Sequence, residues 1–201
     1  MRRGLLIVVS APSGAGKSTL CRALLRQRRN LVFSISVTTR APRPGERDGK
    51  DYFFVSEAAF RAMRARRDLA EWAVVHGRHY GTPKSFLDRM RGAGKDVLLD
   101  IDVQGALKVK RHYPDAVLIF ITTPRFSDLE RRLRRRSSEE ETEIRRRLAD
   151  ARRELRYKNR YDYVIVNGRI PKALRELNKI LDEESLKSSS PPRRRGSSTI
   201  K

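Results

Sequence analysis

Short apolar runs alternate with longer amphipathic segments along most of the chain. Runs rich in Val, Ile or Leu, each bounded by polar or turn residues, occupy residues 5–9, 97–99, 117–121 and 163–166. Runs of this kind are typical of parallel strands that are buried on both faces, and the segments between them are long enough for helical crossovers. The pattern therefore predicts an α/β fold, a parallel sheet core flanked by helices. A fifth run, residues 33–37, alternates apolar residues with Ser and predicts a strand leading into an insertion.

The clearest helix is the last one. Pro171 suits a first-turn position, and one face at helical spacing carries Ala173, Leu174, Leu177, Ile180 and Leu181. Beyond Leu186 the sequence is rich in Ser, Pro and Arg and has no apolar periodicity. We therefore expect a disordered basic tail over residues 187–201.

Two stretches interrupt the strand–helix rhythm. The first is turn-rich and has one helix-like piece after Ser56, and the second is dense in Arg and Glu. Both are expected to be insertions on one core rather than separate domains. The predicted organisation is a single domain over residues 1–186, with core segments at 1–34, 86–126 and 149–186 and insertions at 35–85 and 127–148.

The composition narrows the classes of partner. A chain of 201 residues with 38% hydrophobic residues can bury one core. Its 46 Lys and Arg against 24 Asp and Glu give a formal charge of +22, which favours polyanionic partners: nucleic acid, an anionic membrane or phosphorylated small molecules. Composition alone would rank nucleic acid first, but the motifs below favour a small-molecule substrate.

The single cysteine, Cys21, excludes an intrachain disulfide and a cysteine-rich zinc site, and it is expected to be a small buried thiol. The apolar run at residues 5–9 follows two arginines but is too short for a signal peptide. No stretch approaches the length of a membrane span. The sequence thus predicts a cytoplasmic protein.

A phosphate-binding loop follows the first apolar run. It reads Ala11-Pro12-Ser13-Gly14-Ala15-Gly16-Lys17-Ser18-Thr19 and contains the Gly-Lys-Ser core of the Walker A pattern, with Ala11 where the generic pattern has Gly. Small residues allow successive N–H groups to surround a phosphate, and the following helix adds its positive end. Lys17 would reach the outer phosphates and Ser18 would bind Mg²⁺. The alternative is an ordinary glycine-rich turn.

A carboxylate and an arginine pair extend this chemistry. Asp100 ends the run at residues 97–99, and an aspartate at that edge of a parallel sheet helps to hold the metal or its water shell. Arg40 and Arg43 flank Pro42, with Tyr52 nearby as a hydroxyl donor. Two guanidinium forks and a phenol form a suitable clamp for a terminal phosphate dianion.

In these segments the sequence resembles the guanylate kinase family. The resemblance rests on residues 36–46 and 49–55, on Glu71-Trp72, on Tyr80-Gly81-Thr82, on Leu99-Asp100-Ile101-Asp102-Val103-Gln104-Gly105 and on Val164-Ile165-Val166-Asn167. It extends from the first strand to about residue 185. It implies a P-loop fold in which residues 35–85 bind GMP and residues 127–148 form a small lid.

The resemblance implies transfer of the γ-phosphoryl group of ATP to GMP, and to dGMP, in purine nucleotide metabolism, with Mg²⁺ as cofactor. The catalytic residues it implies are Lys17, Arg40, Arg136 and Arg147. Besides residues 11–19, ATP would contact Arg132, Arg136 and Asn167. GMP would contact Ser36, Arg40, Arg43, Tyr52, Glu71, Tyr80, Thr82 and Asp102. Mg²⁺ would be held by Ser18 and Asp100, partly through water.

One departure and several alternatives accompany the resemblance. Arg136 is followed by Ser137, where the family usually has Gly, which bears on the lid's hinge. Thr82 precedes Pro83 and is also a candidate helix N-cap, and Tyr80 could serve packing alone.

Three rival functions remain. A non-catalytic scaffold of related fold need not keep Lys17, Ser18 and Asp100. A nucleic-acid-binding protein gives no reason for Glu71 and Asp102, and a P-loop kinase for another small molecule is disfavoured by the GMP-site residues. No nucleic-acid or membrane partner is expected, and the sequence leaves the oligomeric state open.

Overall fold

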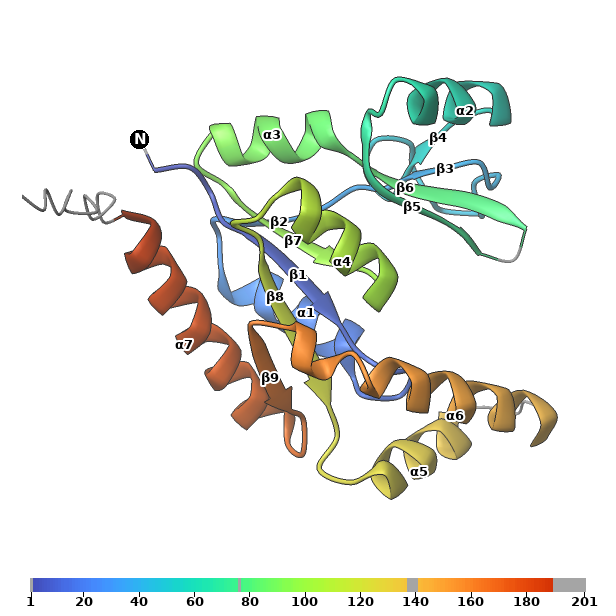
Figure 1. Ribbon diagram of the computed structural model, residues 1–201, viewed down its shortest axis with the longest axis vertical. Coiled ribbons are helices and arrows are strands. Elements are labelled where there is room, and N and C mark those ends of the chain that lie inside the picture. The colour runs from blue at the N-terminus through green and yellow to red at the C-terminus, as the bar shows by residue number, and fades with distance from the viewer. Residues whose placement is uncertain (1, 76, 137–140, 190–201) are drawn as a thin grey trace, which may run out of the picture.

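The computed structural model describes residues 2–75, 77–136 and 141–189, without the side chains of Arg136 and Ser189. Its centre is a five-stranded sheet in the order β2-β7-β1-β8-β9 (Figure 1). The strands are β1 (Leu6–Ser10), β2 (Leu31–Phe33), β7 (Asp96–Asp100), β8 (Val117–Thr122) and β9 (Tyr163–Val166). All neighbouring pairs are parallel. The predicted α/β fold with a parallel sheet core is confirmed.

Helices cover both faces of this sheet, so successive side chains of β1 enter two different cores. Ile7 and Val9 pack with α1 (Lys17–Gln27) and α7 (Ile170–Ser189). Leu6 and Val8 pack with α3 (Lys84–Gly92) and α4 (Val103–His112). Burial on both faces is the reason that these strands are continuous apolar runs.

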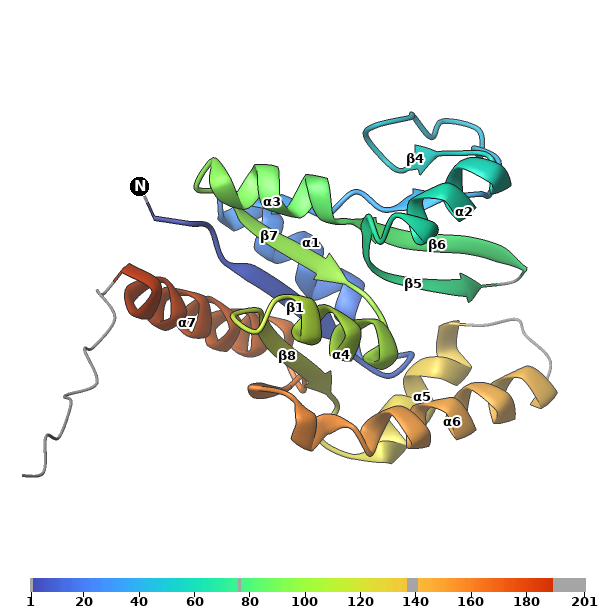
Figure 2. The same cartoon turned by 45° about the horizontal axis from the view of Figure 1, so that its top comes forward.

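The first insertion forms its own four-stranded sheet in the order β4-β3-β6-β5, which lies beyond α3 and carries α2 on its outer side (Figure 2). Its elements are β3 (Val37–Thr38), β4 (Phe53–Phe54), α2 (Glu57–Ala65), β5 (Leu69–Val75) and β6 (Arg78–Pro83). The helix-like piece after Ser56 is confirmed, because Ser56 caps α2 by accepting a hydrogen bond from the Ala59 N–H at 3.1 Å.

The single strand expected at residues 33–37 is wrong. Its two ends belong to different sheets: Phe33 pairs with Leu98 in β7, whereas Val37 pairs with Gly81 and Phe53. The chain leaves the core between them, where the Ser34 N–H donates to the Leu98 carbonyl at 2.9 Å. The alternation of Ser and apolar residues thus marks a crossing between two sheets.

The second insertion consists of α5 (Phe126–Arg136) and α6 (Glu141–Leu155), which project together from the sheet (Figure 2). A short 3₁₀ turn, Lys158–Arg160, leads from α6 to β9. Although the segment is dense in charge, its few apolar residues join the core on the α1 face: Leu129, Leu133, Ile144, Leu148 and Ala151.

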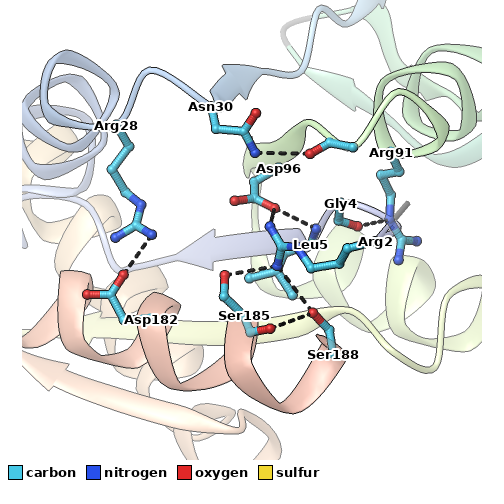
Figure 3. Close-up of polar contacts among 11 residues, drawn as sticks. Arg2, Gly4, Leu5, Arg28, Asn30, Arg91, Asp96, Asp182, Ser185 and Ser188 are labelled. Atoms are coloured by element: carbon cyan, nitrogen blue, oxygen red, sulfur yellow. Dashed lines mark hydrogen bonds and ion pairs between the residues drawn. The ribbon is translucent and has the colours of Figure 1, made fainter. Parts of the chain in front are cut away.

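A polar network closes the sheet at the amino ends of its strands (Figure 3). Arg2 donates to Asp96 at 2.9 Å and to Ser185 of α7, also at 2.9 Å. Asp96 also accepts a hydrogen bond from the Leu5 N–H at 2.8 Å. These bonds hold the last turns of α7, which continues to Ser189, so the tail expected from residue 187 is helical at its start. The rest of that tail, residues 190–201, lies outside the described residues.

Candidate active site

The phosphate-binding loop joins the carboxyl end of β1 to the first turn of α1. Gly16 precedes the helix with φ 91°, a left-handed conformation that favours glycine. A Cβ at Gly16 would lie 2.5 Å from Nδ2 of Asn167. The loop N–H groups and the positive end of α1 together form an anion site. The sequence placed this loop between a strand and a helix, and the structure has it there.

Side chains from distant elements fix the back of the loop. Asn167, which follows β9, donates from Nδ2 to the Ala15 carbonyl at 2.8 Å. Arg132 of α5 donates to the Asn167 carbonyl at 2.9 Å. Arg147 of α6 donates to Oγ of Ser13 at 2.6 Å. Arg132 and Asn167 were expected beside ATP, and in this structure both contact the loop backbone.

A cavity of about 970 Å³ lies between the loop and α6. Its loop wall consists of Ala11, Pro12, Ser13, Gly14, Gly16, Lys17, Ser18 and Thr19. Its other wall contains Arg147 together with residues to which sequence reasoning gave no role: Arg22, Glu143, Arg146, Asp150 and Glu154. Arg22 lies on α1, which directly follows the loop. The residues of α6 carry no local motif that would mark them, because they reach the loop only through the fold.

A second cavity, of about 290 Å³, lies between the central sheet and the first insertion. Predicted residues in its wall are Ser36, Tyr52, Thr82 and Asp100. Asp100 also forms an ion pair with Lys17, which lines the larger cavity. The Lys17–Asp100 pair therefore joins the wall of one cavity to the wall of the other.

The arginine–proline segment gathers a set of polar groups around Arg40. Its guanidinium donates to the Tyr80 hydroxyl at 3.2 Å and to Glu46 at 2.9 Å, and lies 5.3 Å from the centroid of the Tyr52 ring. The hydrogen bond from Arg40 lowers the pKa of Glu46. Arg43 contacts Glu46 through its backbone N–H at 2.8 Å, and its side chain is exposed.

Two carboxylates lie where β5 of the insertion approaches α4 of the core. Glu71 is buried and accepts a hydrogen bond from the Thr82 hydroxyl at 2.6 Å. Burial raises the pKa of Glu71, and the charge of nearby Asp102 adds to the rise. Asp102 caps α4 by accepting a hydrogen bond from the Gly105 N–H at 2.7 Å.

Thr82 was considered as a candidate N-cap of the next helix, and the structure shows that it does not cap α3. The cap position of α3 is Pro83, which makes no side-chain cap bond, and the Thr82 hydroxyl is held by Glu71 instead. The absence of a side chain at Gly105 leaves room for the Glu71 carboxylate, since a Cβ there would lie 3.1 Å from Oε2 of Glu71. A substitution at Gly105 would crowd one of the two carboxylates.

Comparison with known proteins identifies the family. The sequence profile described as guanylate kinase matches residues 3–184. The guanylate kinase of Syntrophotalea carbinolica is 50% identical over 94% of this chain and 90% of its own. That of Caldanaerobacter subterraneus is 46% identical over 91% and 89%. The chain belongs to the guanylate kinase family.

A solved guanylate kinase has the same fold. The crystal structure of guanylate kinase from Anaplasma phagocytophilum matches with a TM-score of 0.71 at 36% identity, covering 92% of this chain and 88% of that one. The resemblance noted in the sequence is confirmed. As a member of the guanylate kinase family, the chain is an ATP-dependent nucleoside monophosphate kinase.

Some expectations fall outside what the structure describes. The side chain of Arg136 and the lid position Ser137 are not among the described residues. Within the described ranges, no helix is both long enough and apolar enough to cross a membrane.

Proposed function

We propose that this guanylate kinase family member transfers the γ-phosphoryl group of ATP to GMP, with ATP in the larger cavity and GMP in the smaller. The observation that carries the proposal is the ion pair between Lys17, which lines the larger cavity, and Asp100, which lines the smaller one. Phosphoryl transfer requires two anions to be placed in line and their charge to be neutralised where they meet. A lysine at that junction meets this requirement.

On the ATP side, the loop N–H groups would bind the phosphates and Lys17 would turn from Asp100 toward the phosphoryl group in transfer. Ser18 and Asp100 would hold Mg²⁺, which when bound offsets the negative charge of the phosphates. Among the described residues there is no cluster of three or more His, Cys, Asp or Glu suited to a metal. Mg²⁺ is commonly held by one or two protein ligands plus substrate phosphates, so this small donor set fits it.

On the GMP side, Arg40, Tyr52 and Tyr80 would bind the phosphate, with Arg43 moving in from the surface. Arg40 is held by Glu46 in this structure, and the stronger charge of a phosphate dianion would replace that carboxylate. Because none of these contacts involves the ribose, dGMP should serve as an acceptor. Purine nucleotide metabolism in the cytoplasm is the proposed setting.

Base choice would depend on Glu71 and Asp102. Guanine presents N1–H and N2–H₂ as adjacent donors, and each carboxylate has one oxygen left to accept them, since Thr82 and Gly105 occupy the others. Adenine has a bare N1 lone pair at that place, which a carboxylate repels. Ser36 and Thr82 lie in the wall of the smaller cavity, whose described lining does not include Glu71 or Asp102, and they would assist.

The test is Glu71→Gln. A hydrogen bond to a charged group contributes about 1.5–3 kcal/mol, so the variant should lose about ten- to a hundredfold in kcat/KM for GMP with little change in the KM for ATP. ADP release with ATP, Mg²⁺ and each of GMP, AMP, CMP and UMP measures this loss.

The matched control is Asp68→Asn, which removes a carboxylate from the same insertion. Asp68 pairs with Arg66, and its substitution should leave base preference unchanged. An unchanged GMP-to-AMP ratio in both Glu71→Gln and Asp102→Asn would refute the assignment.

A further inference from the structure

Lys108 of α4 joins the core to the first insertion. Its ammonium donates a hydrogen bond to the Trp72 carbonyl of β5 at 3.0 Å, and it lies 5.3 Å from the centroid of the Trp72 ring. One lysine of the core therefore contacts both the backbone and the side chain of a residue in the insertion. The roles proposed above for substrate binding do not include Lys108.

This contact lies next to the two carboxylates proposed to read the base. Trp72 directly follows Glu71 on β5, and Lys108 lies less than two turns after Asp102 on α4. Between them on α4 is Gly105, against which the Glu71 carboxylate packs. Residues three apart on a helix are neighbours on its surface. Successive turns of α4 therefore contact the Glu71 carboxylate and the backbone that follows it.

The two carboxylates belong to different parts of the fold, and their charges repel each other. Burial raises the pKa of Glu71, the hydrogen bond from Thr82 lowers it, the charge of Asp102 raises it and the charge of Lys108 lowers it. The repulsion is relieved either by moving β5 away from α4 or by a cation nearby. Lys108 supplies the cation, and its bond to Trp72 opposes the movement.

Trp72 extends this link into the rest of the insertion. Its ring packs against the small core formed by Val37, Phe60 and Leu69, and the Arg64 guanidinium of α2 lies 3.5 Å from the ring centroid. β5 is the edge strand of the insertion's sheet nearest α4 (Figure 2). A bond that holds Trp72 therefore holds the whole insertion against the core rather than one residue of β5.

We propose that Lys108 is a positioning residue for guanine recognition, which holds Trp72 and thereby keeps Glu71 beside Asp102 at the spacing that two adjacent guanine donors require. Lys108 itself does not contact the substrate. The inference rests on the proposed reading of the base by Glu71 and Asp102. Loss of Lys108 should weaken GMP binding and leave ATP binding unchanged, because the larger cavity is lined by the phosphate-binding loop, α1 and α6.

The experiment is calorimetric titration of the full chain with GMP, without ATP. Lys108→Met removes the ammonium and keeps a side chain of similar length, so its Kd for GMP should rise about five- to tenfold, the effect of one lost hydrogen bond. Lys108→Arg restores a cationic donor and should return the Kd toward that of the parent chain. A thermal melt shows that each variant is folded, and Lys108→Gln tests the same loss of charge should Lys108→Met not fold.

The matched control is Arg64→Met. It removes a cation from the same Trp72 ring but leaves the hydrogen bond between β5 and α4 intact. It should bind GMP as the parent chain does.

Two further readouts separate positioning from a general loss of structure. In the ADP-release assay, Lys108→Met should raise the KM for GMP and lower the preference for GMP over AMP, with the KM for ATP unchanged. Trp72 is the one tryptophan of the chain, so its fluorescence reports on β5 directly. Acrylamide should quench that fluorescence more readily in Lys108→Met than in the parent chain or in Lys108→Arg.

The outcomes distinguish this inference from the proposed function. Unchanged GMP binding by Lys108→Met, or equal weakening of GMP and ATP binding, would overturn the inference and leave the proposed function intact. An equal loss in Arg64→Met would assign the effect to the Trp72 ring instead of the link to α4, and would overturn it as well. Failure of the parent chain to bind GMP would overturn the proposed function and this inference together.

Discussion

Strand β7 begins and ends with an aspartate, and the two residues lie in different surroundings. Asp96, at the amino end, is 4% exposed and accepts hydrogen bonds from Arg2 and from the Leu5 N–H (Figure 3). Asp100, at the carboxyl end, pairs with Lys17 beside two cavities. The amino-end aspartate joins the N-terminal segment to the sheet, whereas the carboxyl-end one lies where ligands of α/β sheets bind.

The difference extends to the surrounding residues. At the amino end, polar groups pair with backbone atoms and with each other, as when Arg91 donates to the Gly4 carbonyl at 2.8 Å. At the carboxyl end, two of the cations expected to bind substrate have internal partners in this structure: Lys17 has Asp100, and Arg40 has Glu46. We propose that a substrate phosphate replaces one member of each pair, which makes these pairs exchangeable rather than structural.

The largest expected effect is that of Lys17→Ala. Removing one preorganised group that stabilises developing charge costs about 10²- to 10³-fold in kcat, while the melting temperature should change little because the pair with Asp100 is exchangeable. A coupled ADP-release assay and a thermal melt measure the two quantities. Lys110→Ala is the matched control: Lys110 bonds to Ala116 and Asp162 away from both cavities and should leave kcat unchanged. Near-normal turnover of folded Lys17→Ala protein would contradict the role given to the loop.

The next largest effect is a difference between substitutions of the two aspartates of β7, Asp96 and Asp100. Asp96→Ala leaves the Leu5 N–H without its acceptor and removes one acceptor of Arg2, so it should cost about 1–3 kcal/mol of unfolding free energy and leave kcat per folded molecule unchanged. Asp100→Asn should do the reverse, lowering kcat with little loss of stability. Urea unfolding and initial rates on both variants test this. If Asp96→Ala lost turnover without losing stability, the two ends of the sheet would not be separable in the way proposed.

Much of the core could be predicted because its features are local in the sequence. Strands buried on both faces are continuous apolar runs, and the phosphate-binding loop is one contiguous segment. Strand β2 was missed because Val32 and Phe33 are partly exposed at the sheet edge. In the insertion's sheet, β3 and β4 could not be predicted because they have two residues each, too few to produce a periodic pattern.

The parts of the site that could not be predicted depend on contacts between distant segments. Thr82 has a plausible local role as a helix cap, and only the fold brings Glu71 to its hydroxyl. Glu154 and Ser13 line the same cavity although they lie 141 positions apart in the sequence, and nothing in the charged sequence of α6 distinguishes Glu154 from its neighbours. The family resemblance named candidate substrate-binding residues, whereas the internal partners of Lys17 and Arg40 are contacts that only the structure shows.

The smallest expected effect concerns stability. It is the loss in free energy of unfolding that ionisation of Glu154 causes at the carboxyl end of the sheet. Burial raises the pKa of Glu154 to about 7 in the folded protein, against an ordinary value near 4.3 in an unfolded chain. Between these values the folded state holds a proton that the unfolded state has released, so this group lowers stability progressively as the pH rises toward 7, and by a constant amount above it. Glu154→Gln removes the ionisable group and keeps a polar side chain of similar size. The variant should therefore melt at a higher temperature than the parent chain at pH 8, and the difference should shrink at pH 5.

The control is Asp96→Asn, at the other end of the sheet. It should have a lower melting temperature than the parent at pH 8, because it weakens the hydrogen bonds that Asp96 accepts from Arg2 and Leu5. A lower melting temperature for Glu154→Gln at pH 8 would mean that this carboxylate stabilises the fold as Asp96 does, and that the two ends of the sheet use their acidic residues alike.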